Sequence, residues 1–154
     1  MKKVMVVYYS VSGKTEKMAE FIAEGIRFND LQAVVKKMDD IKDAEEMLGY
    51  DGYILGSPTF SLDIPNPVKT FLAMLKDVNL EGKLSGAFGP YLHDASYEHN
   101  GHAPTLILDV LQKENKIKSF DLGGLTLNEN IVETKEGIQA CQDYGRMFGQ
   151  KLGS

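Results

Sequence analysis

Residues 4–15 read VMVVYYSVSGKT, and this stretch decides the fold. Residues 4–9 form a continuous β-branched and aromatic run, which is typical of a parallel strand covered on both faces. Behind the run the hydrophobic period changes, because apolar residues recur at helical spacing at Met18, Ile22 and Ile26. The stretch therefore predicts a central strand, a tight loop and a helix in direct succession.

The same alternation continues along the chain. We expect further strands at residues 31–38, 53–56, 85–91 and 118–127. We expect a short helical patch at 44–48 and longer helices beginning at Asn66-Pro67 and near Ala103 and spanning 138–152. The first of these strands is polar enough for a sheet edge, and Asn66 is the expected N-cap of its helix. The pattern favours an α/β fold: a doubly wound parallel sheet of five strands with helices on both faces.

Length, charge and cysteine content narrow the class of protein. A chain of 154 residues fits one domain, which we expect to span residues 1–154. The net charge of −5 disfavours nucleic acid and anionic membrane as partners. The apolar run behind Met1 is too short for a signal peptide or a membrane span, so we expect a cytoplasmic location. We also expect a monomer. The single cysteine, Cys141, is expected to be buried and inert.

The loop after the first strand carries the strongest sign of a ligand. Open parallel sheets bind ligands at the carboxyl ends of their strands, where backbone N–H groups and a helix N-terminus attract anions. The candidate phosphate-binding residues are Ser10, Val11, Ser12, Gly13, Lys14 and Thr15. An ATPase phosphate loop would need glycine at the position of Tyr8, so a terminal monophosphate fits better. A capped turn without a ligand is the alternative.

Three loops in this order resemble those of the flavodoxin family. Residues 10–15 resemble its S/T-x-T-G-x-T phosphate loop, with Ser12 where threonine is usual. Residues 56–60, GSPTF, resemble the loop that covers one flavin face, and residues 94–98, DASYE, resemble its D-S-S-Y-E segment. Residues 56–59 are also similar to the flavin domain of flavodiiron proteins. The resemblance implies a short flavodoxin-like chain with strand order 2-1-3-4-5 that binds FMN.

The resemblance also implies roles for residues of the second and third loops. Phe60 would cover one face of the flavin, and either Tyr91 or Tyr97 would stack on the outer face. Asp94 would lie near the ribityl chain or the pyrimidine edge, and Ser61 occupies a place where many flavodoxins have glycine. The remaining residues expected to contact FMN are Ser57, Pro58, Thr59 and Gly89.

The implied function is electron transfer between redox partner proteins, a donor reductase and an acceptor enzyme. FMN would supply the chemistry, so catalytic residues of the chain's own are not expected. One alternative is a flavodoxin-like NAD(P)H-dependent quinone or flavin reductase, and another is a flavin-free module that binds a small anion. His93, His99 and His102 share one loop, but their spacing fits no compact metal motif, and we expect them to be solvated.

Overall fold

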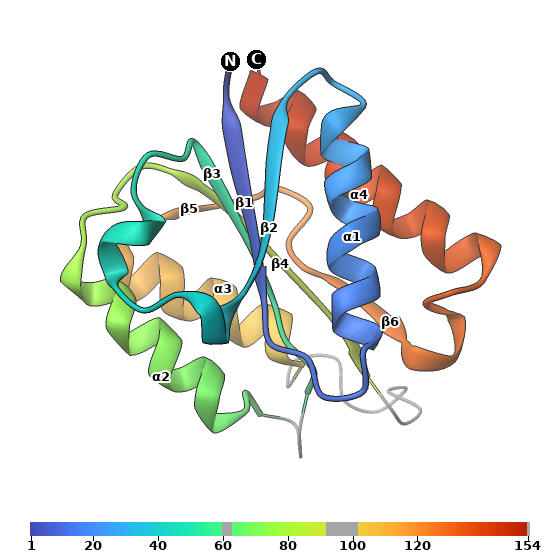
Figure 1. Ribbon diagram of the computed structural model, residues 1–154, viewed down its shortest axis with the longest axis horizontal. Coiled ribbons are helices and arrows are strands. Elements are labelled where there is room, and N and C mark those ends of the chain that lie inside the picture. Colours follow the sequence, from blue (N-terminus) through green and yellow to red (C-terminus); the bar gives the residue numbers. More distant parts are fainter. Residues whose placement is uncertain (60–62, 92–101, 154) are drawn as a thin grey trace.

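The buried strands of the sequence form one parallel sheet with the order β2-β1-β3-β4-β5, and β6 also pairs with β4 (Figure 1). The computed structural model describes residues 1–59, 63–91 and 102–153. Its strands are β1 (Lys3–Tyr8), β2 (Gln32–Lys37), β3 (Gly52–Gly56), β4 (Leu84–Tyr91), β5 (Lys118–Ser119) and β6 (Leu125–Asn128). Its helices are α1 (Lys14–Arg27), α2 (Asn66–Met74), α3 (Ala103–Asn115) and α4 (Lys135–Gly153), with short 3-10 turns η1 (Met38–Asp40), η2 (Ala44–Met47), η3 (Leu75–Asp77) and η4 (Glu129–Ile131). The predicted strand order and the edge position of β2 are confirmed.

Two helical layers cover the sheet because the side chains of its central strand alternate between the faces. Val4 and Val6 belong to the apolar cluster under α1 and α4, whereas Met5 and Val7 belong to the cluster under α2 and α3. Figure 1 shows the two pairs of helices on opposite sides of the sheet. The continuous hydrophobic run of β1 is thus explained by burial on both faces.

The predicted fifth strand at residues 118–127 is wrong as one element, because it is divided into β5 and β6. Between them Gly123 takes a left-handed φ of 71°, and its N–H closes a turn on the Phe120 carbonyl at 2.9 Å. The buried Tyr144 hydroxyl of α4 donates to the Gly123 carbonyl at 2.6 Å and accepts from the Ala87 N–H at 3.2 Å. The Tyr144 side chain of α4 is therefore hydrogen-bonded to β4 between the residues that pair with β5 and those that pair with β6.

The start of α2 also differs from the prediction. Pro65, not Asn66, is the N-cap, and Asn66 is already helical. The extended Pro65, with ψ 149°, leaves its carbonyl free to accept from the N–H groups of Val68 and Lys69, at 3.0 and 3.1 Å. Behind it the apolar residues at helical spacing, Val68, Phe71, Leu72 and Leu75, are all buried.

The chain termini and the carboxyl ends of the central strands lie at opposite ends of the sheet. At one end the chain termini lie side by side (Figure 1), and the Lys2 ammonium donates to the Leu152 carbonyl at 2.8 Å. At the other end the carboxyl ends of β1, β3 and β4 meet, as they must in a parallel sheet. None of the described helices is long and apolar enough to span a membrane.

Candidate functional site at the carboxyl ends of the strands

The loop between β1 and α1 places a helix N-terminus at the carboxyl end of the sheet. Gly13 is the N-cap and takes a left-handed φ of 89°, which glycine adopts without strain. Within the described residues no side chain caps this helix. The first N–H groups of α1 therefore point out of the helix without intrahelical partners, and together with the helix dipole they favour an anion.

Three hydroxyls surround this N-terminus in different environments. The Ser10 Oγ accepts from the Gly13 N–H at 3.0 Å, so this serine also closes the loop. Ser12 is exposed, whereas Thr15 is only 1% exposed in the first turn of α1. Val11, at the tip, is 64% exposed. The loop thus carries three hydroxyl groups next to the first N–H groups of α1.

Lys14 is engaged elsewhere. Its ammonium forms an ion pair with Glu133, which precedes α4, at 2.5 Å. The same contact lowers the pKa of the Glu133 carboxyl, first through the hydrogen bond from Lys14 and then through its charge. Lys14 therefore joins α1 to the segment before α4, a contact that the local motif does not reveal.

The loop after β3 lies beside β4 and the start of α3. Ser57 is fully buried, and its hydroxyl donates to the Pro58 carbonyl at 2.8 Å. The Thr59 Oγ1 accepts from the Ala103 N–H at 2.9 Å and so satisfies a donor of the first turn of α3. A Cβ at Gly89 would lie 1.8 Å from the Ser57 carbonyl oxygen. Gly89 is thus required for the close approach of this loop to β4.

Tyr91 ends β4 with its ring stacked on His102, at 5.0 Å between centroids and 25° between planes. The expectation that His102 is solvated is wrong, since it is 5% exposed. It is buried because it is the N-cap residue of α3 and packs against the end of β4. In the described part of the chain, no group of three or more histidine, cysteine or acidic side chains could hold a metal ion.

Several predicted residues lie outside the described residues. They are Phe60, Ser61, Asp94 and Tyr97 of the expected flavin contacts, together with His93 and His99.

Cys141 is fully buried, as predicted, and burial raises the pKa of its thiol to about 12. Its thiol therefore stays protonated at neutral pH and is a poor nucleophile.

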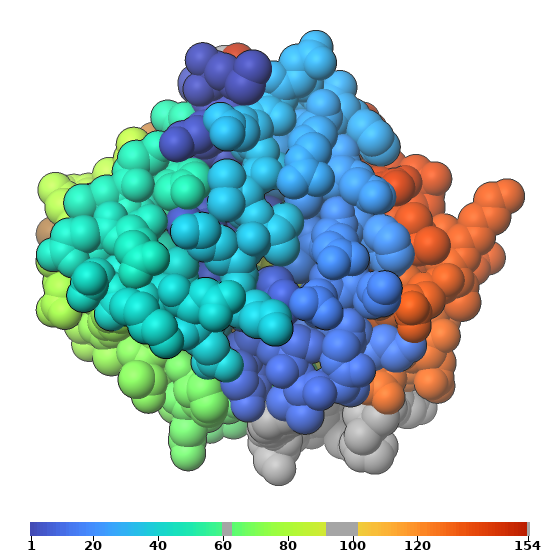
Figure 2. Space-filling model, viewed as in Figure 1, coloured from blue at the N-terminus to red at the C-terminus, as the bar shows by residue number. Residues whose placement is uncertain are grey.

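A cavity of about 240 Å³ lies beside the phosphate loop, toward β2. Figure 2 shows the segment that follows β2, in cyan, next to the blue surface of this loop. The lining includes Tyr8, Glu16, Lys37 and Asp39, and the Tyr8 hydroxyl donates to the Glu16 carboxylate at 2.5 Å. Sequence reasoning missed this contact, although a tyrosine at the end of a buried strand and an acid in the following helical turn are its signal.

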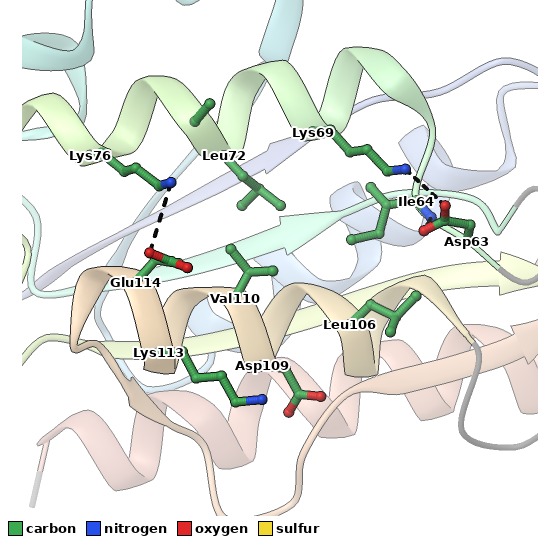
Figure 3. A pocket seen from close by; sticks show the side chains of 11 residues that line it. Asp63, Ile64, Lys69, Leu72, Lys76, Leu106, Asp109, Val110, Lys113 and Glu114 are labelled. Carbon is green, nitrogen blue, oxygen red and sulfur yellow. Dashed lines mark hydrogen bonds and ion pairs between the residues drawn. The ribbon is translucent and has the colours of Figure 1, made fainter.

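A second cavity, of about 540 Å³, lies between α2 and α3 (Figure 3). Leu72, Leu106 and Val110 contribute an apolar floor, and the ion pairs Lys69–Asp63 and Lys76–Glu114 lie along its rim. Three lysines and three acids line it in all, the other two being Lys113 and Asp109. This balance of charge gives the cavity no preference for a charged ligand.

Comparison with known proteins agrees with this geometry. The family model described as Flavodoxin matches residues 6–124. The chain is 29% identical to "Probable flavodoxin 2" of Bacillus subtilis, over 99% of this chain and 98% of that protein. It is 31% identical to "Putative diflavin flavoprotein A 4" of Nostoc, over 97% of this chain. A solved structure of a flavodoxin from the domain Archaea has a TM-score of 0.84, with 28% identity over 99% of both chains.

The family match covers well over half of the chain, so this protein belongs to the flavodoxin family. Flavodoxins and the flavin domains of flavodiiron proteins bind FMN, which is therefore the cofactor of this chain. Members of the flavodoxin family use this cofactor to carry electrons. The chain spans about a quarter of the length of the diflavin flavoproteins that it matches.

The described residues fit the phosphate end of FMN. The first N–H groups of α1 and the hydroxyls of Ser12 and Thr15 are donors, which a phosphate monoester accepts. Gly13 faces open space, because a Cβ there would meet nothing within 4 Å. Its left-handed φ also favours glycine at this position. The donor set is the chemistry that an FMN phosphate requires.

Proposed function

We propose that this protein carries single electrons between redox partner proteins, taking them from a donor reductase and passing them to an acceptor enzyme. The observation that carries the proposal is the helix N-terminus of α1 at the carboxyl end of β1, in a chain of a family that binds FMN. Bound FMN supplies the redox chemistry, and the protein supplies binding and electrostatics.

The proposal assigns the FMN contacts to three loops. The phosphate is held by the N–H groups and hydroxyls of residues 10–15, and the ring lies between residues 57–61 and the segment that begins at Tyr91. Supporting this, Gly89 brings the loop after β3 against β4, and Thr59 ties that loop to the start of α3. We further propose that the protein acts as a monomer in the cytoplasm.

The test begins with a titration of the purified full chain with FMN, followed by stepwise reduction with dithionite. We expect binding of one FMN per chain and two separable one-electron steps. The reduced protein should then reduce cytochrome c in a stopped-flow experiment without added nicotinamide.

Two outcomes would favour the alternatives. Rapid NAD(P)H oxidation with a quinone acceptor by the protein alone would indicate a reductase. A colourless protein that takes up no added FMN would indicate a flavin-free module that binds another small anion.

A further inference from the structure

One hydrogen bond links the end of β1 to the first turn of α1, across the phosphate loop. The Tyr8 hydroxyl donates to Oε2 of Glu16 at 2.5 Å. Tyr8 is 5% exposed and belongs to the apolar cluster under α1 and α4. Burial, followed by the hydrogen bond to Glu16, raises the pKa of the Tyr8 phenol, so it is a neutral donor at every physiological pH.

The Glu16 carboxylate creates a conflict at this site. It lies in the first turn of α1, where the helix dipole favours negative charge. The same turn is where the phosphate must bind, and two negative groups at short range repel each other. A free glutamate at this position would therefore compete with the phosphate for the first N–H groups of the helix.

The cavity beside the loop shows where this carboxylate is held. Glu16 lines it together with Tyr8, Lys37 and Asp39, on the side toward β2. Ser10, Val11 and Gly13 of the phosphate loop line it as well, whereas Ser12 and Thr15 do not. The carboxylate thus lies beside the loop and accepts from the Tyr8 hydroxyl, and among the described residues no hydrogen bond joins it to the first N–H groups of α1.

We propose that Tyr8 is a positioning residue for phosphate recognition, acting by holding the Glu16 carboxylate away from the phosphate-binding N–H groups. The inference rests on the proposed binding of FMN through residues 10–15. It assigns to Tyr8 a role in selecting FMN over riboflavin, which has the same ring but lacks the phosphate.

The test compares FMN and riboflavin affinities of variants by fluorescence titration. Tyr8→Phe removes the donor and should weaken FMN binding roughly three- to tenfold, with riboflavin binding unchanged. Glu16→Gln keeps an acceptor but removes the charge, so FMN should bind at least as tightly and with a changed dependence on salt. The double variant combines Tyr8→Phe with Glu16→Gln and has no carboxylate at position 16 to be freed. Its FMN affinity should therefore return to within about twofold of the Glu16→Gln value.

Tyr53→Phe is the matched control, because the Tyr53 hydroxyl also is buried and donates to a carbonyl, that of Met47, far from the loop. It should leave the ratio of the two affinities unchanged. Urea unfolding of each variant separates a loss of fold from a loss of recognition. An unchanged ratio in Tyr8→Phe, or a double variant as weak as Tyr8→Phe, would overturn the positioning role while leaving FMN binding intact. Failure of the wild type to bind FMN would overturn both proposals.

Discussion

Thr15 gives the most direct test of the phosphate site among single residues, because it is buried in the first turn of α1. A hydrogen bond to a charged group contributes about 1.5 to 3 kcal/mol, so Thr15→Val should weaken FMN binding roughly tenfold to a hundredfold. Riboflavin binding should change little. Thr70→Val, on the exposed face of α2, is the control in the same fluorescence titration. Unchanged FMN affinity in Thr15→Val would contradict the assignment.

Tyr91 and Tyr97 are the two candidates for the residue that stacks on the outer face of the flavin. One face of the Tyr91 ring is stacked on His102, and Tyr97 lies outside the described residues, so its stacking stays a prediction from the family resemblance. An electron-rich ring disfavours added negative charge on a flavin stacked against it. Tyr97→Ala should therefore raise the potential of the second electron by more than Tyr91→Ala does, in a spectroelectrochemical titration. The reverse order would assign the stack to Tyr91.

At the scale of elements, the gap between β5 and β6 depends on α4. Tyr144→Phe removes the hydroxyl that bonds both Gly123 and Ala87 and leaves a buried N–H without its partner. We expect the free energy of unfolding to fall by about 1 to 3 kcal/mol in urea titrations. Amide exchange at Ala87 should become faster, while FMN affinity is retained. An unchanged free energy of unfolding would mean that water replaces the hydroxyl.

At the scale of the whole molecule, acid should weaken the fold through carboxylates near its surface. The pKa values of Glu46 and Glu133 are lowered below the ordinary 4.5, by hydrogen bonds from backbone N–H groups and from Lys14 respectively. A lowered pKa in the folded state gives stability that is complete above pH 4.5 and is lost as the pH falls through the lowered value.

Urea titrations at low salt should therefore show a falling free energy of unfolding below about pH 4.5. Glu133→Gln should make this fall shallower, because its ion pair with Lys14 is already absent. High salt should reduce the effect of the ion pair, since both side chains are partly exposed. Equal slopes in the wild type and Glu133→Gln would show that the pair contributes nothing to acid sensitivity.

Local patterns of the sequence predicted the sheet and the helix N-terminus that we propose as the phosphate site. A run of apolar residues followed by helical spacing specifies β1 and α1, because side-chain periodicity depends only on neighbouring residues. Gly13 and the hydroxyls around it lie on one short loop, so their convergence at the start of α1 also follows from local sequence. The apolar stripe of α2 was predictable for the same reason.

Tertiary structure alone decided the contacts that join distant residues. The division of the predicted fifth strand depends on the Tyr144 hydroxyl of α4. The burial of His102 depends on its stacking with Tyr91. The position of the Lys14 ammonium depends on its ion pair with Glu133. Each contact joins segments that become neighbours only when the layers pack, so no local period contains it. The sequence by itself determined a parallel α/β sheet with a helix N-terminus after β1, where we propose the phosphate site. Packing decided which side chains face that site and which are bound elsewhere.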